Sequence, residues 1–219
     1  MLYLYAFVPR ITATPDVLGI AGRQPTLVPL GIVAALVGEV EGAIEPEEEN
    51  VLAHARVVDA LGSVNDAVLP VRFGRGFRDV EDLEAAAARL EHDIEQRLEE
   101  VRGCVEIGLH VVAPPQQSEP EASGRDYMER RLRDLSRAEE LAAEIHAPLA
   151  EHARDANRTL SVGATALLRA AYLVPRDEVD SFKARVERAQ HRHPELSFAC
   201  TGPWPPYSFA ALEPEEATA

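Results

Sequence analysis

The sequence has 219 residues, of which 46% are hydrophobic, and its 37 acidic and 22 basic side chains give a formal net charge of −15. A chain of this length and apolar content can bury a real core, which excludes disorder throughout and suits one large domain or two small ones. The negative charge argues against a nucleic-acid partner, because phosphates would be repelled.

The N-terminal half alternates between predicted strands and helices. Residues 2–8, LYLYAFV, have the aromatic and β-branched content of a strand. Residues 31–40, GIVAALVGEV, form an apolar run bounded by glycines, which is typical of an inner strand covered on both faces. A helix is predicted from the glutamates around Pro46 to Gly62, with Val51, Leu52, Ala55, Val58 and Leu61 at helical spacing.

The next segment is a predicted strand followed by the clearest helix in the sequence. Residues 67–74, AVLPVRFG, are expected to be extended, and a single helix is expected over residues 79–102. Acidic residues come early in this helix and Gly103 stops it. Its apolar residues recur at steps of three and four: Val80, Leu83, Ala87, Leu90, Ile94, Leu98 and Val101.

The C-terminal half is predicted as strand, long helix, strand, helix, strand. The strands are residues 104–112, 165–174 and 195–201, and the shorter helix is residues 177–193. Residues 113–124, APPQQSEPEASG, have the composition of a mobile, protease-sensitive loop. The long helix begins near Arg125, and Pro148 is expected to kink or divide it. Its apolar stripe is Met128, Leu132, Leu135, Ala138, Ala142, Ile145 and Leu149.

These elements predict an α+β fold made of two small α/β domains. We place an N-terminal domain at residues 1–103 and a C-terminal domain at residues 104–219, with a boundary in the loop at residues 114–123 as the alternative. The order of elements in the second domain indicates a ferredoxin-like arrangement that lacks or blurs one strand. An extended arm rich in proline and aromatic residues ends the chain.

The sequence has none of the common catalytic motifs. We find no GxSxG, Walker loop, HExxH or CxxC, so we expect no enzymatic activity, no catalytic residue and no cofactor. His191 and His193 are two residues apart near a helix end and point to different sides, so we expect them to complement the helix dipole rather than to bind a metal.

The expected compartment is reducing and cytoplasmic. Cys104 and Cys200 are too few for a disulfide framework, and each is expected to be a small buried side chain. The apolar start of the chain has no basic segment and is interrupted by Pro9, and the longest apolar runs fall short of the roughly 20 residues that a membrane span needs.

The stretch LPVRFGRGF, residues 69–77, gathers basic residues on an acidic protein. Arg72, Arg75 and Arg78 lie at its end and in the turn beyond, while Phe73 continues its apolar face. Two interpretations remain open. The arginines pair internally with the surplus carboxylates, which we favour, or they receive a carboxylate-bearing partner segment.

The stretch TGPWPPYSF, residues 201–209, is expected to be a stiff, polyproline-like arm. Trp204, Tyr207 and Phe209 would each bury a large apolar area if they found a surface. That surface is either the chain's own first domain, which we favour, or another protein. Exposed aromatic residues in a soluble monomer would promote aggregation.

Five segments together carry a resemblance to a known family: MLYLYAF, LPVRFGRGF, SGRDYMERR, AAYLVP and TGPWPPYSF. In order and spacing they resemble the gas vesicle protein F/L family over nearly the whole chain, without separating the F and L branches. The resemblance implies an accessory protein of gas vesicle assembly with two α/β domains, the second of them ferredoxin-like, and implies no catalytic residues.

The resemblance favours binding over turnover. We expect a holder or scaffold, in the cytoplasm and at the gas vesicle, that binds the apolar shell subunit or other vesicle accessory proteins. Its net charge would keep such a complex dispersed. The alternatives are a minor structural component of the vesicle wall and a ferredoxin-like regulatory module that binds a small molecule.

Overall fold

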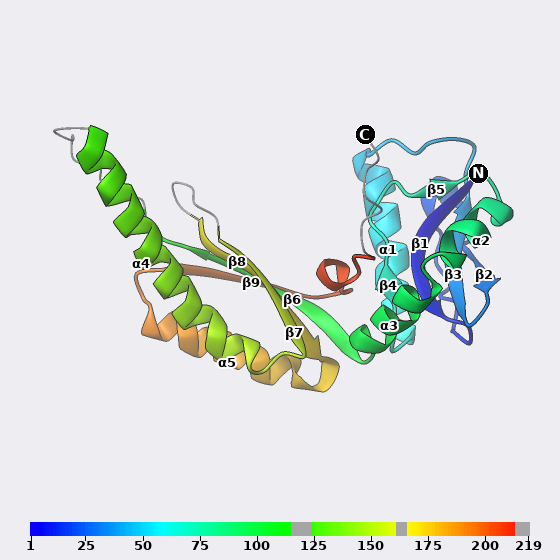
Figure 1. Cartoon of the computed structure of the whole chain (residues 1–219). Coiled ribbons are helices and arrows are strands. Elements are labelled where there is room, and N and C mark those ends of the chain that lie inside the picture. Colours follow the sequence, from blue (N-terminus) through cyan, green and yellow to red (C-terminus); the bar gives the residue numbers. More distant parts are fainter. Residues whose placement is uncertain (115–123, 161–165, 213–219) are drawn as a thin grey trace. The chain divides into compact units, whose positions relative to one another are not determined.

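The computed structural model describes residues 1–114, 124–160 and 166–212, and divides into two compact units (Figure 1). The first unit comprises Met1–Val105 and the chain from Trp204 on, and the second comprises Glu106–Pro203. The arm therefore groups with the first unit, whereas the sequence analysis assigned it to the C-terminal domain. The fold is a mixed α+β fold with two sheets, as predicted.

The first unit is built on a five-stranded sheet in the order β2-β3-β1-β4, with β5 also paired to β1. Its strands are β1 Leu2–Pro9, β2 Thr26–Leu30, β3 Val33–Glu39, β4 Leu69–Pro70 and β5 Gly76–Phe77. Every residue of β3 except Glu39 is buried, and this strand pairs antiparallel with both β1 and β2. The prediction of an inner strand here is confirmed.

The strand predicted over residues 67–74 is much shorter in the structure. Only Leu69–Pro70 pair with β1, and the chain then turns through residues 73 and 74 before β5. Gly74 has a φ of 97°, a left-handed conformation that favours glycine and ends the extended run. The alternation of apolar residues in this segment therefore comes from a turn that packs one side against the core.

The single helix predicted over residues 79–102 is wrong, because the structure has two helices there. These are α2 Val80–Ala88 and α3 Glu91–Val101. Leu90, with φ −118° and ψ 9°, separates them. The apolar spacing continues through the break, so both helices still bury their predicted faces at Leu83, Ala87, Ile94, Leu98 and Val101.

The helix α1 runs over Glu48–Val64, two residues beyond the predicted end at Gly62. Its buried face is also rotated from the predicted one. Val51 and Leu52 are 40% and 50% exposed. The buried residues are instead Ala53, His54, Val57, Val58, Leu61 and Gly62, so a histidine occupies the centre of the apolar face.

The turn between β2 and β3 gives a test of this packing. Gly31 has a φ of 65°, a left-handed conformation in which any residue with a Cβ is strained, and a Cβ here would also displace the flexible carboxylate end of Glu91 on α3. We expect Gly31→Ala to lower the free energy of unfolding by about 1 to 3 kcal/mol, measured by urea denaturation. The control is Gly42→Ala, where the new Cβ meets nothing within 4 Å. A Gly31→Ala variant as stable as this control would contradict the structure.

The second unit has a four-stranded sheet in the order β7-β8-β6-β9. The strands are β6 Cys104–Val112, β7 Asp155–Leu160, β8 Ala166–Pro175 and β9 Ser197–Trp204, and the helices are α4 Gly124–Ala150, the short η2 Arg176–Glu178 and α5 Val179–Arg192. β7 is the strand that the sequence analysis missed. Alternate residues of β6 and β8 form one core with α4 and α5, so these helices cover the same face of the sheet (Figure 1).

The positions of Pro148 and of the two cysteines bear on the predictions. Pro148 lies in the last turn of α4, which continues to Ala150, so the proline does not divide the helix. Cys104 is buried, but Cys200 on β9 is exposed, so that part of the cysteine prediction is wrong. Residues 115–123 of the predicted protease-sensitive loop lie outside the described residues.

Within the described ranges, no helix combines the length and apolar character needed to cross a membrane.

Candidate interaction site on the first unit

A histidine surrounded by aromatic rings lies in the core of the first unit. Tyr3 and Tyr5 are two residues apart on β1, so they share one face of the sheet, and α1 lays His54 against that face. His54 is 3% exposed, and its ring stacks on Tyr5 with a centroid distance of 5.5 Å. We name this group the His54 cluster: Tyr3, Tyr5, His54, Phe73 and Tyr207.

Hydrogen bonds fix the cluster. The Tyr3 hydroxyl lies 2.9 Å from His54 Nδ1 and accepts a hydrogen bond of 3.2 Å from the backbone N–H of Gly74. Its own proton can therefore be donated to Nδ1, which leaves the imidazole proton on Nε2. Among the described residues, the buried Nε2 has no partner at full hydrogen-bond geometry, and the imidazole has only a weaker interaction with the backbone of Val71. The Tyr5 hydroxyl accepts from the backbone N–H of Ile20 at 2.8 Å.

Burial keeps the whole cluster neutral. It lowers the pKa of His54 to about 4, and the carbonyl of Val71 opposes this shift only in part. It also raises the pKa of Tyr3 to about 12 and raises the pKa values of Tyr5 and Tyr207. An uncharged His54 at neutral pH packs among the aromatic rings as a structural residue.

The turn between β4 and β5 places one predicted residue in the core and one on the surface. Phe73 is half-buried against the cluster, with its ring centroid 5.9 Å from that of His54. Arg72, beside it, is exposed. Phe73 therefore anchors the turn to the core, and the guanidinium of Arg72 is exposed to solvent.

The other two arginines of this segment have different surroundings. Arg78 forms an ion pair of 3.0 Å with Asp82 on α2, and this carboxylate raises the pKa of the guanidinium. Arg75 lies over the ring of Phe77, 5.9 Å from its centroid. Internal pairing, the interpretation that we favoured for the three arginines, thus holds for Arg78. Neither Arg72 nor Arg75 makes an ion pair with a described residue.

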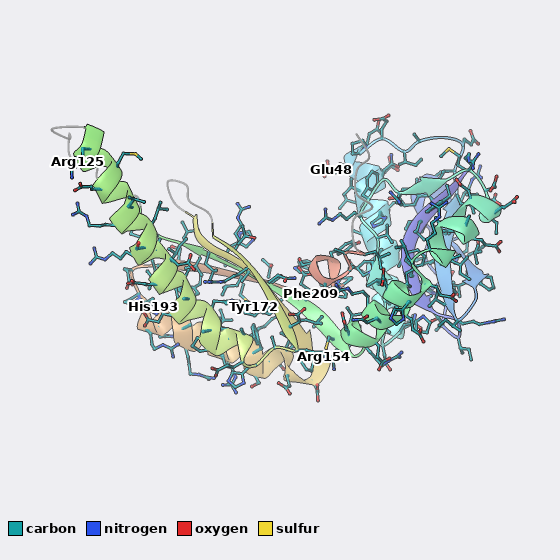
Figure 2. All side chains as sticks on the ribbon, viewed as in Figure 1. Glu48, Arg125, Arg154, Tyr172, His193 and Phe209 are labelled. Atoms are coloured by element: carbon teal, nitrogen blue, oxygen red, sulfur yellow. The ribbon has the colours of Figure 1, made fainter. Side chains whose placement is uncertain are left out.

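The arm brings two of its three aromatic residues into the first unit. Tyr207 and Phe209 lie on the short helix η3 Tyr207–Phe209, and Figure 2 marks Phe209 there. Phe209 is 6% exposed, and Tyr207 contributes to the His54 cluster, with its ring centroid 6.3 Å from that of His54. Trp204, at the end of β9, remains 49% exposed. The docked aromatic residues hold the arm while its indole stays accessible.

Two segments far apart in the sequence therefore meet at one histidine. Phe73 from the turn and Tyr207 from the arm both contact the His54 ring. We name the two segments together the arm–turn site: Arg72, Phe73 and Arg75 of the turn, and Trp204 and Tyr207 of the arm. The sequence analysis singled out these five residues but missed His54. The sequence did contain a signal for His54. It precedes the apolar Val58 by four residues and Leu61 by seven, which places it on the same face of the helix.

His191 and His193, near the end of α5, each contact a different residue. His191 Nδ1 lies 2.7 Å from the carbonyl oxygen of Glu187, and His193 Nδ1 lies 3.7 Å from a carboxylate oxygen of Glu195. In the part of the chain that the structure describes, no three His, Cys, Asp or Glu side chains gather as a metal site would require.

Comparison with known proteins gives the family. The family model described as gas vesicle synthesis protein GvpL/GvpF matches residues 1–211 of this chain. The chain belongs to the gas vesicle GvpL/GvpF family. Gas vesicle protein L of Streptomyces sp. (strain CB03234) is 33% identical, with 90% of this chain and 87% of that protein covered. Gas vesicle protein F1 of Halobacterium salinarum is 25% identical, with 96% and 93% covered.

Solved structures of GvpF share the fold. The crystal structure of GvpF from Anabaena sp. PCC7120 matches with a TM-score of 0.84 at 18% identity, covering 97% of this chain and 96% of that one. GvpF from Microcystis aeruginosa matches with a TM-score of 0.81 at 18% identity, covering 96% and 99%. The resemblance predicted from sequence is confirmed, and this GvpL/GvpF-family protein takes part in gas vesicle formation. Two of the segments that carried the resemblance build the arm–turn site.

Proposed function

We propose that this protein is an accessory factor of gas vesicle assembly that binds the apolar shell subunit, and other vesicle proteins, through the arm–turn site. One observation carries the proposal: the turn and the arm both contact the His54 ring, and Arg72, Arg75 and Trp204 of these two segments are exposed. Tryptophan and arginine are the residue types that most often dominate binding energy at protein interfaces.

The arm is suited to recognition because it loses little entropy on binding. Prolines at positions 203, 205 and 206 restrict the backbone on both sides of Trp204, and the buried Phe209 fixes the end of the segment. An apolar subunit that covers the exposed half of the indole would bury additional apolar area without rearranging the arm.

The role that we propose is binding rather than turnover. The arm–turn site presents aromatic and guanidinium groups, and the histidine beneath it is buried with a pKa lowered to about 4. The net charge of −15 would keep a complex with an apolar subunit dispersed. We place this holder in the cytoplasm and at the growing vesicle.

The two compact units are proposed to be two domains, the second of them ferredoxin-like. The order β6, α4, β7, β8, α5, β9 and the sheet order β7-β8-β6-β9 support this assignment.

The proposal is tested by co-purification of the full chain with the shell protein. We expect the double variant Trp204→Ala/Arg72→Glu to recover at least about tenfold less shell protein than the unaltered chain. The control is Arg192→Glu, which makes the same charge change at an exposed position at the end of α5. Equal recovery by the double variant and the control would overturn the proposal.

Washing purified vesicles separates the holder from a wall component. A holder is expected to leave the vesicles in a mild wash, because it would bind the shell subunit only until that subunit joins the wall. Retention of the protein on the vesicles after a wash that removes peripheral proteins would favour the wall component instead.

A further inference from the structure

The exposed indole of the arm–turn site stands on a segment that departs from regular strand geometry. Trp204 is the last residue of β9 and is 49% exposed. Two residues before it, Gly202 has a φ of 105°, which lies outside the range of a regular strand. Pro203, between them, has no backbone N–H that could bond to a neighbouring strand. The indole therefore needs support from elsewhere if it is to keep one direction.

A lysine of α5 supplies such a support. The Lys183 ammonium donates a hydrogen bond of 3.0 Å to the carbonyl oxygen of Gly202. Both residues lie in the second unit, and the lysine side chain is partly buried. A hydrogen bond from a charged donor is stronger than one between neutral groups, and partial burial strengthens it further.

The helix that carries Lys183 is itself held by the core. Phe182 and Val186 of α5 are 1% and 3% exposed and belong to the core of the second unit. Because Phe182 directly precedes Lys183, the lysine side chain leaves a backbone that is packed in place. The hydrogen bond thus ties the end of β9 to a fixed helix.

The ammonium of Lys183 is directed at this carbonyl although a carboxylate is available nearby. Glu187 lies four residues later on the same helix, at a spacing that permits an ion pair. Within the part of the chain that the structure describes, Lys183 forms its hydrogen bond with Gly202 and no ion pair. It is also the only lysine in a sequence with 22 lysine and arginine residues. A compact ammonium suits a single carbonyl oxygen, whereas a planar guanidinium suits two acceptors.

We propose that Lys183 is a positioning residue of the arm–turn site, because its bond to the Gly202 carbonyl sets the direction in which Trp204 faces a partner. The bond fixes the peptide plane between Gly202 and Pro203. The proline ring then restricts φ at position 203, so little backbone freedom remains before Trp204. An indole held in this way loses less entropy when a partner covers it. The consequence for binding rests on the proposed function, whereas the ordering of the indole does not.

Tryptophan fluorescence of the full chain tests the ordering, because Trp204 is the only tryptophan. Lys183→Met keeps a long unbranched side chain and removes the donor. It should shift much of the anisotropy decay of the indole from overall tumbling to nanosecond motion of the segment. Arg188→Met removes one positive charge at an exposed position of the same helix and should leave the decay unchanged. Circular dichroism checks the folding of both variants, and Lys183→Gln, whose side chain is shorter than that of lysine, replaces a misfolded Lys183→Met.

Co-purification with the shell protein tests the consequence for binding. Lys183→Met should recover about threefold to tenfold less shell protein than Arg188→Met, which is the loss expected from one hydrogen bond to a charged group. The double variant Trp204→Ala/Arg72→Glu is measured beside them. A purely structural role of Lys183 would lower the urea midpoint of Lys183→Met and leave the anisotropy decay of the folded protein unchanged.

Two results would overturn the inference. The first is an anisotropy decay of Lys183→Met equal to that of Arg188→Met. The second is full recovery of shell protein by Lys183→Met under conditions in which Trp204→Ala/Arg72→Glu loses it. Full recovery by this double variant would overturn the proposed function instead, and the anisotropy decay would then still decide whether Lys183 orders the indole.

Discussion

Replacing Phe209 with alanine is expected to lower the free energy of unfolding by about 3 to 5 kcal/mol, because a phenyl ring that is 6% exposed would leave a cavity in the first unit. Trp204→Ala, by contrast, should cost less than about 1.5 kcal/mol, since the indole is 49% exposed. Urea denaturation of the full-length variants, followed by circular dichroism, measures both values.

This pair of variants separates the two roles within the arm. Phe209 holds the arm on the first unit, and Trp204 is the residue that a partner would cover. If Trp204→Ala destabilised the protein as much as Phe209→Ala, the indole would be part of the core, and its role in recognition would be contradicted.

The stability of the protein is expected to fall by about 2 kcal/mol between pH 7 and pH 5 because of His54. The pKa of His54 is lowered from 6.5 to about 4 in the folded protein by burial. The unfolded chain therefore binds a proton at a higher pH than the folded one. The stabilising contribution is complete above about pH 6.5 and is lost as the pH falls toward 4.

The control for this effect is His54→Gln, which does not titrate and retains a group that can accept from the Tyr3 hydroxyl. The cluster's tyrosines remain neutral over this range, because the pKa values of Tyr3, Tyr5 and Tyr207 are all raised. The difference in unfolding free energy between the unaltered chain and the variant should shrink as the pH falls. A difference that stays constant from pH 7 to pH 5 would contradict the burial of His54.

The sequence predicts the central elements of the fold well, because they are wholly apolar or strongly periodic. β3 is a continuous apolar run, and α5 has acidic residues at its start and basic ones at its end. Three strands were missed: β5 has only two residues, Gly76–Phe77, and the longer β2 and β7 are edge strands. TLVPL contains a proline, and DANRTL is mainly polar, so neither has the pattern of a buried strand.

The errors in the helices have a different cause. The buried apolar residues of α2 and α3 follow one continuous helical spacing. This spacing therefore continues through Leu90, although the helix is interrupted there. On α1, the buried His54 is a polar residue on an apolar face, which a pattern of hydrophobic residues does not reveal. Its position depends on Tyr3, which is 51 residues away in the sequence and supplies the hydrogen bond.

Complementation in cells tests the arm–turn site most directly. A gas vesicle host that lacks its own copy of this gene would receive the unaltered gene, the Trp204→Ala/Arg72→Glu variant or the Arg192→Glu control. We predict normal vesicles with the unaltered protein and the control, and few or none with the double variant, although it is folded and present at the same level. Normal vesicle formation by the double variant would contradict the assignment of this surface to vesicle assembly.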